Sequence, residues 1–248
     1  MALLARSHAP RGEYDAAFWI ARGFGPEPTN REKFLALTID ELSETGPHSF
    51  NATLICDLLG TTYPMVNHYF GSRNGLIAEA VARAYGDYVA SLRQAAERGE
   101  TPGARLESWV RRQISWTSEH AGISVIIDFP ESSLEVTTEL RARFQDEMAS
   151  RFSFNMGVLV HLVGDVQRGA ITPITFDEHT VPFGLVSGNL SLVKRASSIG
   201  LATMGAAIWM SGSHAAGGHI ADSIIDREAI VEAHVGMLLR AAAASLDL

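Results

Sequence analysis

The stretch that decides the fold runs from Asn51 to Leu76 and reads NATLICDLLGTTYPMVNHYFGSRNGL. Asn51 stands where a helix N-cap is expected, because its side chain can accept hydrogen bonds from free backbone N–H groups. Leucine and isoleucine at helical spacing then predict a short helix over 52–59. Gly60 follows at once, and glycine permits the left-handed backbone of a sharp turn.

A second helix is predicted over 63–70, directly after this turn. Pro64 falls in its first turn, where the missing N–H costs nothing, and Thr62 stands where its N-cap is expected. Gly71 should end the helix and Ser72 should cap the next one. Helix, glycine turn and helix within 20 residues is the helix-turn-helix arrangement, whose second helix enters the major groove of DNA. Spacing alone is moderately specific, since helical bundles also contain such units.

The remaining sequence also indicates helices. One precedes the motif over 31–45 and stops at Gly46-Pro47, and a long one follows over 73–98. Further helices are predicted over 104–119, 131–149, 151–167, 184–210 and 226–245. Loops are predicted over 120–130, 168–182 and 211–222. The segment 125–127 has the composition of a strand, but without a second strand it is interpreted as a buried loop or helix end, so the chain is predicted to be all-α.

The motif resembles the signature of the TetR family of transcriptional regulators. Ile55-Cys56 stands at the family's Ile-Ala, and 59–62 stands at its Ala-Gly-Val-Ser. His68-Tyr69-Phe70 and Ser72-Arg73 keep the family's register at the end of the second helix. The detailed resemblance covers about residues 31–80; beyond it, only the helical architecture carries over.

The resemblance implies a division of the chain into three parts. An N-terminal extension occupies 1–30. A three-helix helix-turn-helix DNA-binding domain occupies 31–76, and a helical ligand-binding and dimerisation domain occupies 77–248. Ile55, Val66, Phe70 and Leu76 are expected to form the core of the DNA-binding domain.

The resemblance also implies a set of DNA-binding residues, which comprises Asn51, Thr62, Tyr63, Pro64, Met65, Asn67, His68, Tyr69 and Arg73. Thr62 would cap the second helix of the motif, the recognition helix predicted over 63–70, and would donate a hydrogen bond to a DNA phosphate. Residues 63–65 would point into the major groove. Tyr69 would reach the DNA backbone. Arg73 would hold a phosphate with the help of the dipole of its helix. Asn67 departs from the family's usual tyrosine; asparagine can pair with an adenine edge instead.

The charge pattern argues for modest DNA affinity. The formal net charge is −8, and Arg73 is the only Lys or Arg within 61–73. Residues 31–98 contain six basic and eight acidic side chains, so this region carries a slight negative charge. Contacts to phosphates dominate both the affinity for DNA and its dependence on salt. With few basic residues, the affinity for DNA is expected to fall only slowly as the salt concentration rises.

The C-terminal part is expected to bind a small apolar or amphipathic effector. Apolar pockets with a few polar groups are typical of such sites. The residues proposed to line one are Trp109, Trp116, Phe129, Phe144, Phe152, Asn155 and Phe183. For each of them, ordinary core packing remains the alternative. By the resemblance, a homodimer would form through the helices 184–210 and 226–245, whose small residues suit close packing, although packing within a monomer explains the same pattern.

Enzyme motifs are absent from the sequence. It lacks His-Glu-x-x-His, a phosphate-binding glycine loop with lysine, and Gly-x-Ser-x-Gly, so neither catalysis nor a cofactor or metal is expected. Cys56 is the only cysteine and no apolar run approaches the roughly 20 residues of a membrane span, which favours a cytoplasmic protein. The function expected is that of a repressor that a small molecule releases from a palindromic operator. The alternative is a helical small-molecule-binding or interaction protein of the same fold with weak or lost DNA binding.

Overall fold

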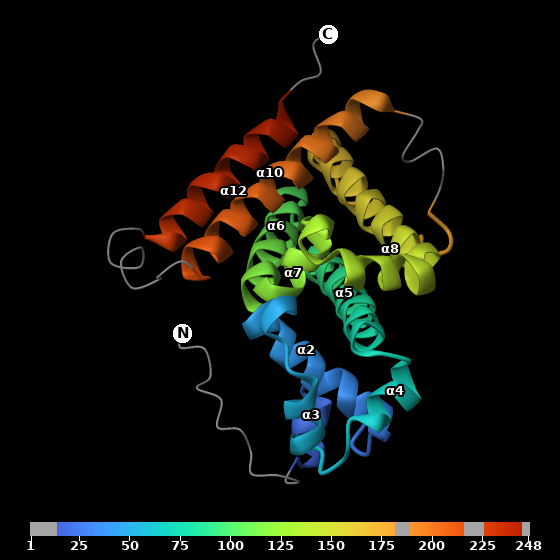
Figure 1. The fold of residues 1–248 in the computed structure, drawn as a ribbon. Helices are drawn as coiled ribbons and strands as arrows, with labels where there is room; N and C mark the ends of the chain where they lie inside the picture. Colours follow the sequence, from blue (N-terminus) through green and yellow to red (C-terminus); the bar gives the residue numbers. More distant parts are fainter. Residues whose placement is uncertain (1–13, 182–188, 216–225, 245–248) are drawn as a thin grey trace. The chain divides into compact units, whose positions relative to one another are not determined.

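The structure is a computed structural model that describes residues 14–181, 189–215 and 226–244 (Figure 1). Every regular element in these ranges is helical, so the predicted all-α class is confirmed. The chain forms two compact units. The first contains 1–84 and 125–144, and the second contains 85–124 and 145–248. The division that the sequence predicts at residues 76 and 77 stays a prediction.

The first unit holds the N-terminal helices. They are α1 (Ala16–Ile20), α2 (Asn30–Ser49), α3 (Ala52–Leu58), α4 (Pro64–Phe70) and the first half of α5 (Arg73–Glu97). The unit also takes the end of α7 (Ala121–Asp128), the short 3-10 helix η1 (Pro130–Ser133) and the start of α8 (Leu134–Arg168). The four residues expected in its core are all buried: Ile55, Val66, Phe70 and Leu76.

Helix α2 bends where the sequence predicts a stop. Thr29 caps its start by accepting from the backbone of Glu32, whose side chain bonds back to Thr29. Gly46 has φ +69° and ψ 174°, which only glycine adopts without strain, and Pro47 follows it. The last turn of α2 therefore leaves the axis of the rest and turns the chain towards α3.

The described part of the N-terminal extension packs on the first unit. Trp19 is buried, and Lys33 of α2 lies 6.0 Å from its ring centroid. Arg22 forms an ion pair of 2.7 Å with Asp40 of α2 while its guanidinium lies over the Phe18 ring. Residues 14–24 thus cover one side of α2.

The second unit contains the remaining helical segments. They are the rest of α5 and of α8, the first half of α7, and the complete helices α6 (Pro102–Glu119), α10 (Leu190–Ala215) and α12 (Arg227–Ala243). Helices α10 and α12 pack on each other, and both pack on α6 (Figure 1). Asp226 caps α12 by accepting from the Ala229 backbone N–H.

Three sequence predictions are wrong after residue 119. The loop predicted over 211–222 begins as helix, because α10 continues to Ala215. The helices predicted over 131–149 and 151–167 are a single 35-residue helix, α8, from Leu134 onward, and residues 131–133 belong to η1. No glycine or proline separates them, and an ion pair of 2.6 Å between Arg151 and Glu147 spans the junction. The predicted loop 120–130 contains helix α7, because Ile123 and Ile126, three residues apart, both bury their side chains.

Asp128 at the end of α7 should make stability depend on pH. Burial raises the pKa of its carboxyl to about 6, against about 3.9 in an unfolded chain. The folded state therefore binds the proton more tightly, so this group lowers the free energy of unfolding as pH rises from about 4 to 6. We expect Asp128→Asn to raise that free energy at pH 7 by up to about 3 kcal/mol, and to do so less at pH 4. Urea unfolding at both pH values measures this; an equal effect at the two would contradict it.

Candidate functional site

The turn between α3 and α4 is built by local chemistry. The Asn51 side chain accepts hydrogen bonds from the backbone of Thr53 and Leu54, at 3.0 and 3.3 Å, and thereby caps α3. Gly60 has φ +62°, the left-handed conformation that the sequence predicts there. The Thr61 backbone N–H then reaches back to the Cys56 carbonyl at 2.9 Å and closes the turn.

Helix α4 begins at Pro64, one residue after the predicted start of the helix at 63. Tyr63 stands at the N-cap position with helical dihedral angles and makes no capping bond through its side chain. The Thr62 carbonyl accepts from the Met65 backbone at 3.0 Å, so Thr62 contributes its main chain only. The predicted capping bond of the Thr62 side chain is therefore not formed, since the contact of Thr62 at this turn runs through its carbonyl and no side chain caps α4. Gly71, with φ +80°, ends the helix.

One face of α4 is exposed and the other is core. Val66 and Phe70 are fully buried, as the spacing of four residues predicts. The exposed residues at the start of the helix and along its outer face are Thr62, Tyr63, Pro64, Asn67 and His68. The sequence-predicted DNA-binding residues of α4 are thus presented together on the surface of the first unit.

Two of the residues predicted to contact DNA are only partly exposed to solvent. Met65 is half-buried. Tyr69 is also half-buried, and its ring lies 6.2 Å from the Phe34 ring and 5.1 Å from the His68 ring, measured between centroids. The Tyr69 ring therefore packs on α2 while part of the residue remains accessible to solvent.

Arg73 holds the bend of α2. Its Nη2 donates to the carbonyls of Pro47 and Phe50 at 2.8 and 3.0 Å, and its guanidinium lies 5.4 Å from the Phe50 ring centroid. Ser72 caps α5 by accepting from the Gly75 backbone at 2.9 Å, which confirms its expected role. Arg73 thus has a structural function that the sequence did not indicate, and its contact to a phosphate stays a prediction.

The predicted effector residues separate into two groups. Trp109, Trp116, Phe152 and Asn155 belong to the second unit, whereas Phe129 and Phe144 belong to the first. Phe183 lies outside the described residues. The set that the sequence grouped together is therefore divided between two units.

Within the second unit, the two tryptophans are core residues with polar or aromatic partners. Trp109 is 1% exposed, and its Nε1 donates to Asn155 Oδ1 at 3.3 Å. The Trp116 ring lies between Tyr88 and His120, at 4.5 and 4.6 Å between centroids.

The two phenylalanines at the surface differ from these. Phe152 is 58% exposed and Phe129 is 49% exposed, so neither is buried within its own unit. Phe144 is half-buried beneath the guanidinium of Arg143.

Gln113 is a buried polar residue that the sequence interpretation missed. It lies on the buried face of α6 between Trp109 and Trp116, and its Oε1 has no hydrogen-bond partner. A buried carbonyl oxygen without a partner costs about 1–3 kcal/mol, so it is a candidate acceptor for a bound group. The one available signal was a glutamine on an otherwise apolar helical stripe.

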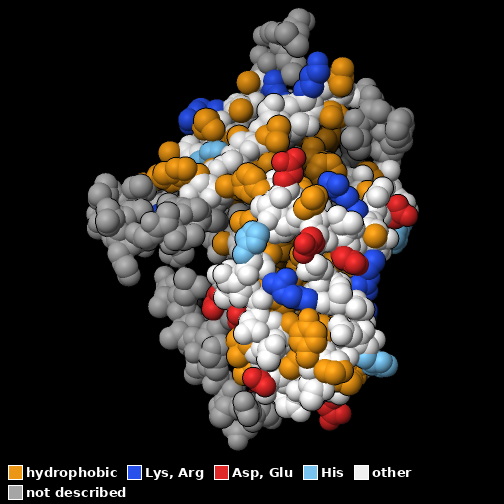
Figure 2. Space-filling view, viewed as in Figure 1, with side chains coloured by type: hydrophobic (Ala, Val, Ile, Leu, Met, Phe, Trp, Pro, Cys, Tyr) orange, Lys and Arg blue, Asp and Glu red, His pale blue; other side chains and the backbone are white. Residues whose placement is uncertain are grey.

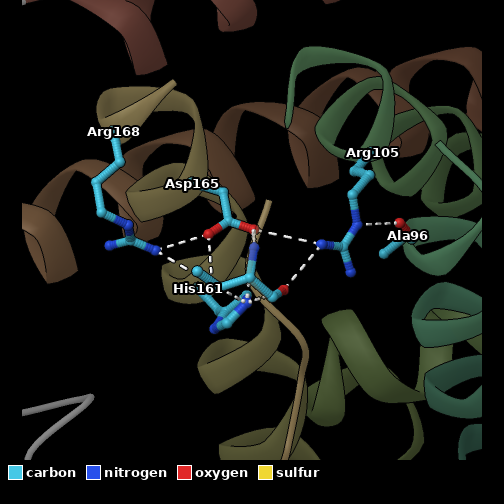
Figure 3. Close-up of polar contacts among 6 residues, drawn as sticks. Ala96, Arg105, His161, Asp165 and Arg168 are labelled. Carbon is cyan, nitrogen blue, oxygen red and sulfur yellow. Dashed lines mark hydrogen bonds and ion pairs between the residues drawn. The ribbon is translucent and has the colours of Figure 1, made fainter. Parts of the chain in front are cut away.

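A buried ionic cluster fixes the chain after α8 (Figure 3). Asp165 is fully buried and accepts from Arg105 Nη1 at 3.3 Å and from Arg168 Nη2 at 2.6 Å. Thr172 donates to the same carboxylate through its backbone at 3.1 Å and its hydroxyl at 2.6 Å. His161 Nε2 lies 3.0 Å from the Thr172 carbonyl. The cluster therefore holds residue 172 against α8 and α6.

Neither a metal centre nor a reactive thiol is indicated among the described residues. They contain no group of three or more His, Cys, Asp and Glu side chains that could hold a metal ion. Cys56 is buried in α3, and burial raises the pKa of its thiol. In the described ranges, none of the helices combines the length and the hydropathy that crossing a bilayer requires.

Comparison with solved structures identifies related folds. The fatty acid degradation regulator FadR from Bacillus halodurans matches with a TM-score of 0.54 and 11% identity, over 86% of this chain and 96% of that one. The transcriptional regulator FadR from Bacillus subtilis, solved in complex with stearoyl-CoA, matches with a TM-score of 0.53 and 12% identity, over 84% and 97%. No protein-family model and no curated protein sequence matches. At this identity the likeness establishes the fold.

Proposed function

We propose that this chain is a ligand-responsive DNA-binding transcriptional regulator of the TetR type, which represses from a palindromic operator and is released by a small molecule. The observation that carries the proposal is the exposed face of α4, where Tyr63, Pro64, Asn67 and His68 stand together at the surface of a capped helix-turn-helix. That face has the placement that base-edge recognition in a major groove needs. The fold shared with two FadR regulators, one of them described as a transcriptional regulator, supports the proposal. The proposed function implies a non-enzyme that acts in the cytoplasm.

We also propose that the protein is a homodimer through α10 and α12, because one recognition helix reads too little DNA and paired half-sites lie about 34–36 Å apart. Helix α10 exposes Leu190, Leu201 and Trp209 on one side. Helix α12 exposes Met237 among small residues, and Figure 2 shows hydrophobic side chains gathered over these helices. An exposed apolar surface on two neighbouring helices is typical of a subunit interface.

Charged substitutions on this surface should separate the subunits. A two-fold interface places each new glutamate in two symmetric copies, so we expect Leu201→Glu or Met237→Glu to weaken dimerisation about 100-fold or more. The control is Phe152→Glu, which alters a similarly exposed residue of the same unit on another helix, α8. Analytical ultracentrifugation measures the change; a wild-type monomer, or variants that remain dimeric, would refute the interface.

For the effector, we propose an amphipathic molecule with a long apolar chain. The B. subtilis regulator of the same fold was solved with stearoyl-CoA, which makes that compound the first probe for this chain. In the second unit, Trp109, Gln113 and Asn155 supply apolar surface together with polar atoms, as ligand sites commonly do. Stearoyl-CoA is expected to weaken operator binding if it prefers the non-binding state.

The decisive experiment is selection from a pool of random duplex DNA at low salt, followed by sequencing. Enrichment of one palindrome by folded, dimeric protein supports the regulator, and its loss on addition of stearoyl-CoA supports the proposed effector class. Enrichment that stearoyl-CoA leaves unchanged would retain the regulator and reject that effector. No enrichment would reject DNA regulation.

One observation favours the alternative, a small-molecule-binding protein of this fold with weak or lost DNA binding. The recognition helix carries no Lys or Arg, and Arg73, the nearest one, already donates to two carbonyls of its own domain. Such a protein would bind its ligand without enriching any sequence. Retention on heparin at low salt separates the two functions rapidly, because phosphate neutralisation needs free cationic groups.

A further inference from the structure

Arg143, near the start of α8, contacts the end of the recognition helix. Its Nη1 lies 3.1 Å from the carbonyl oxygen of Phe70, the last residue of α4, and 3.3 Å from the Gly75 carbonyl. Its Nη2 donates to Glu79 Oε2 of α5 at 3.3 Å. One guanidinium therefore joins α8 to both α4 and α5 within the first unit.

The chemistry of this contact suits the end of a helix. The last carbonyls of a helix lack partners within it, and the helix dipole places partial negative charge there. An arginine that donates to the Phe70 carbonyl satisfies one of these groups in addition to the turn at Gly71. The recognition helix thus receives a tertiary cap at its C-terminus, whereas its N-terminus has no side-chain cap.

Gly75 permits the approach. A Cβ at this position would lie 2.2 Å from the Phe70 carbonyl oxygen and 2.8 Å from Arg143 Nη1. Both distances are well below van der Waals contact, so any side chain would push α5 away from the end of α4 or displace the guanidinium. The residue type at 75 and the position of Arg143 therefore depend on each other.

Glu79 fixes the arginine from the other side. Its side chain is 8% exposed and pairs with Arg31 of α2 at 2.6 Å as well as with Arg143. A buried carboxylate between two guanidinium groups orients both of them. The cluster of Arg31, Glu79 and Arg143 hence ties α2, α5 and α8 to the carbonyl end of α4.

From these contacts we propose that Arg143 is a positioning residue for the recognition helix, which sets the orientation of α4 through the Phe70 carbonyl. The proposal rests on the proposed DNA-binding function. Loss of the contact would leave the exposed face of α4 intact but free to tilt about Gly71. Contacts to base edges depend on that tilt, whereas non-specific attraction to DNA does not.

The test compares Arg143→Met with Arg141→Met, which removes the same charge from an exposed position two residues away. We expect Arg143→Met to lower affinity for the selected operator about tenfold, the worth of one base contact, without changing affinity for a random duplex. Arg143→Lys, which can reach one carbonyl, should recover part of the loss. Equal operator affinity for Arg143→Met and Arg141→Met would overturn the proposal, as would equal losses on operator and random DNA.

Hydrogen–deuterium exchange without DNA keeps this inference separable from the proposed function. Peptides covering 64–76 should exchange faster in Arg143→Met than in Arg141→Met or the wild type, while peptides from α10 remain unchanged. If the wild type selects no operator, the DNA-binding function fails, and faster exchange would still show that Arg143 holds the end of α4. Unchanged exchange in 64–76 would overturn the positioning role whatever the DNA result.

Discussion

Replacing Asp165 with alanine is expected to lower the free energy of unfolding by about 3–5 kcal/mol. The carboxylate is fully buried and accepts four hydrogen bonds, from Arg105, Arg168 and the backbone and hydroxyl of Thr172. Arg105 is also buried, so its positive charge would remain inside the protein without its anionic partner. Removing one member of a buried pair costs far more than losing an exposed pair.

Urea unfolding followed by circular dichroism measures this effect. Asp146→Ala serves as the control, since it removes a carboxylate from an exposed position of the same helix and should change stability by less than about 0.5 kcal/mol. Should the alanine variant fail to fold, Asp165→Asn retains the shape and part of the hydrogen bonding and is expected to fold with intermediate stability. A loss of less than about 1 kcal/mol in Asp165→Ala would contradict a structural role for the cluster.

The second large effect concerns DNA. Tyr63→Ala and Asn67→Ala are each expected to lower affinity for the selected operator by about 5- to 150-fold, because a good contact to a base edge contributes about 1–3 kcal/mol. Both side chains are exposed, so the melting temperature should hardly change. Neither carries charge, so the slope of affinity against salt concentration should stay as in the wild type.

Fluorescence anisotropy at several salt concentrations measures affinity and slope together. Arg73→Met provides the contrast, since its bonds to Pro47 and Phe50 make it a stability variant as well. Thr53→Ala, at an exposed position of α3, is the control that should leave operator affinity unchanged. Full operator affinity in both Tyr63→Ala and Asn67→Ala would show that α4 does not read base edges.

The sequence by itself determined the helices and the turn of the helix-turn-helix. The reason is that their signals are local. Asn51 caps residues two and three positions ahead, and Gly60 sets its own backbone angle. The spacing of Val66 and Phe70 also identified the buried face of α4, and with it the exposed one. Such interactions span a few residues and leave their pattern in the chain.

Local sequence patterns did not predict the helix boundaries correctly at two places, the start of α4 and the middle of α8. Thr62 is a good cap by type, yet it meets the start of α4 through its carbonyl, and the helix starts without a side-chain cap. The junction near 150 contains polar residues without a breaker, and α8 continues through it with an ion pair between Arg151 and Glu147 across the junction.

Only the tertiary structure decided what the charged and aromatic residues do. Arg73 binds carbonyls 23 and 26 residues away, Arg105 meets Asp165 across 60 residues, and Arg143 meets Phe70 across 73. In sequence, each of these arginines resembles a solvated charge on a helix. The aromatic residues assigned to one pocket likewise fall into two units. A partner far along the chain leaves no periodic signal, so burial and pairing of these groups emerge only when the helices pack.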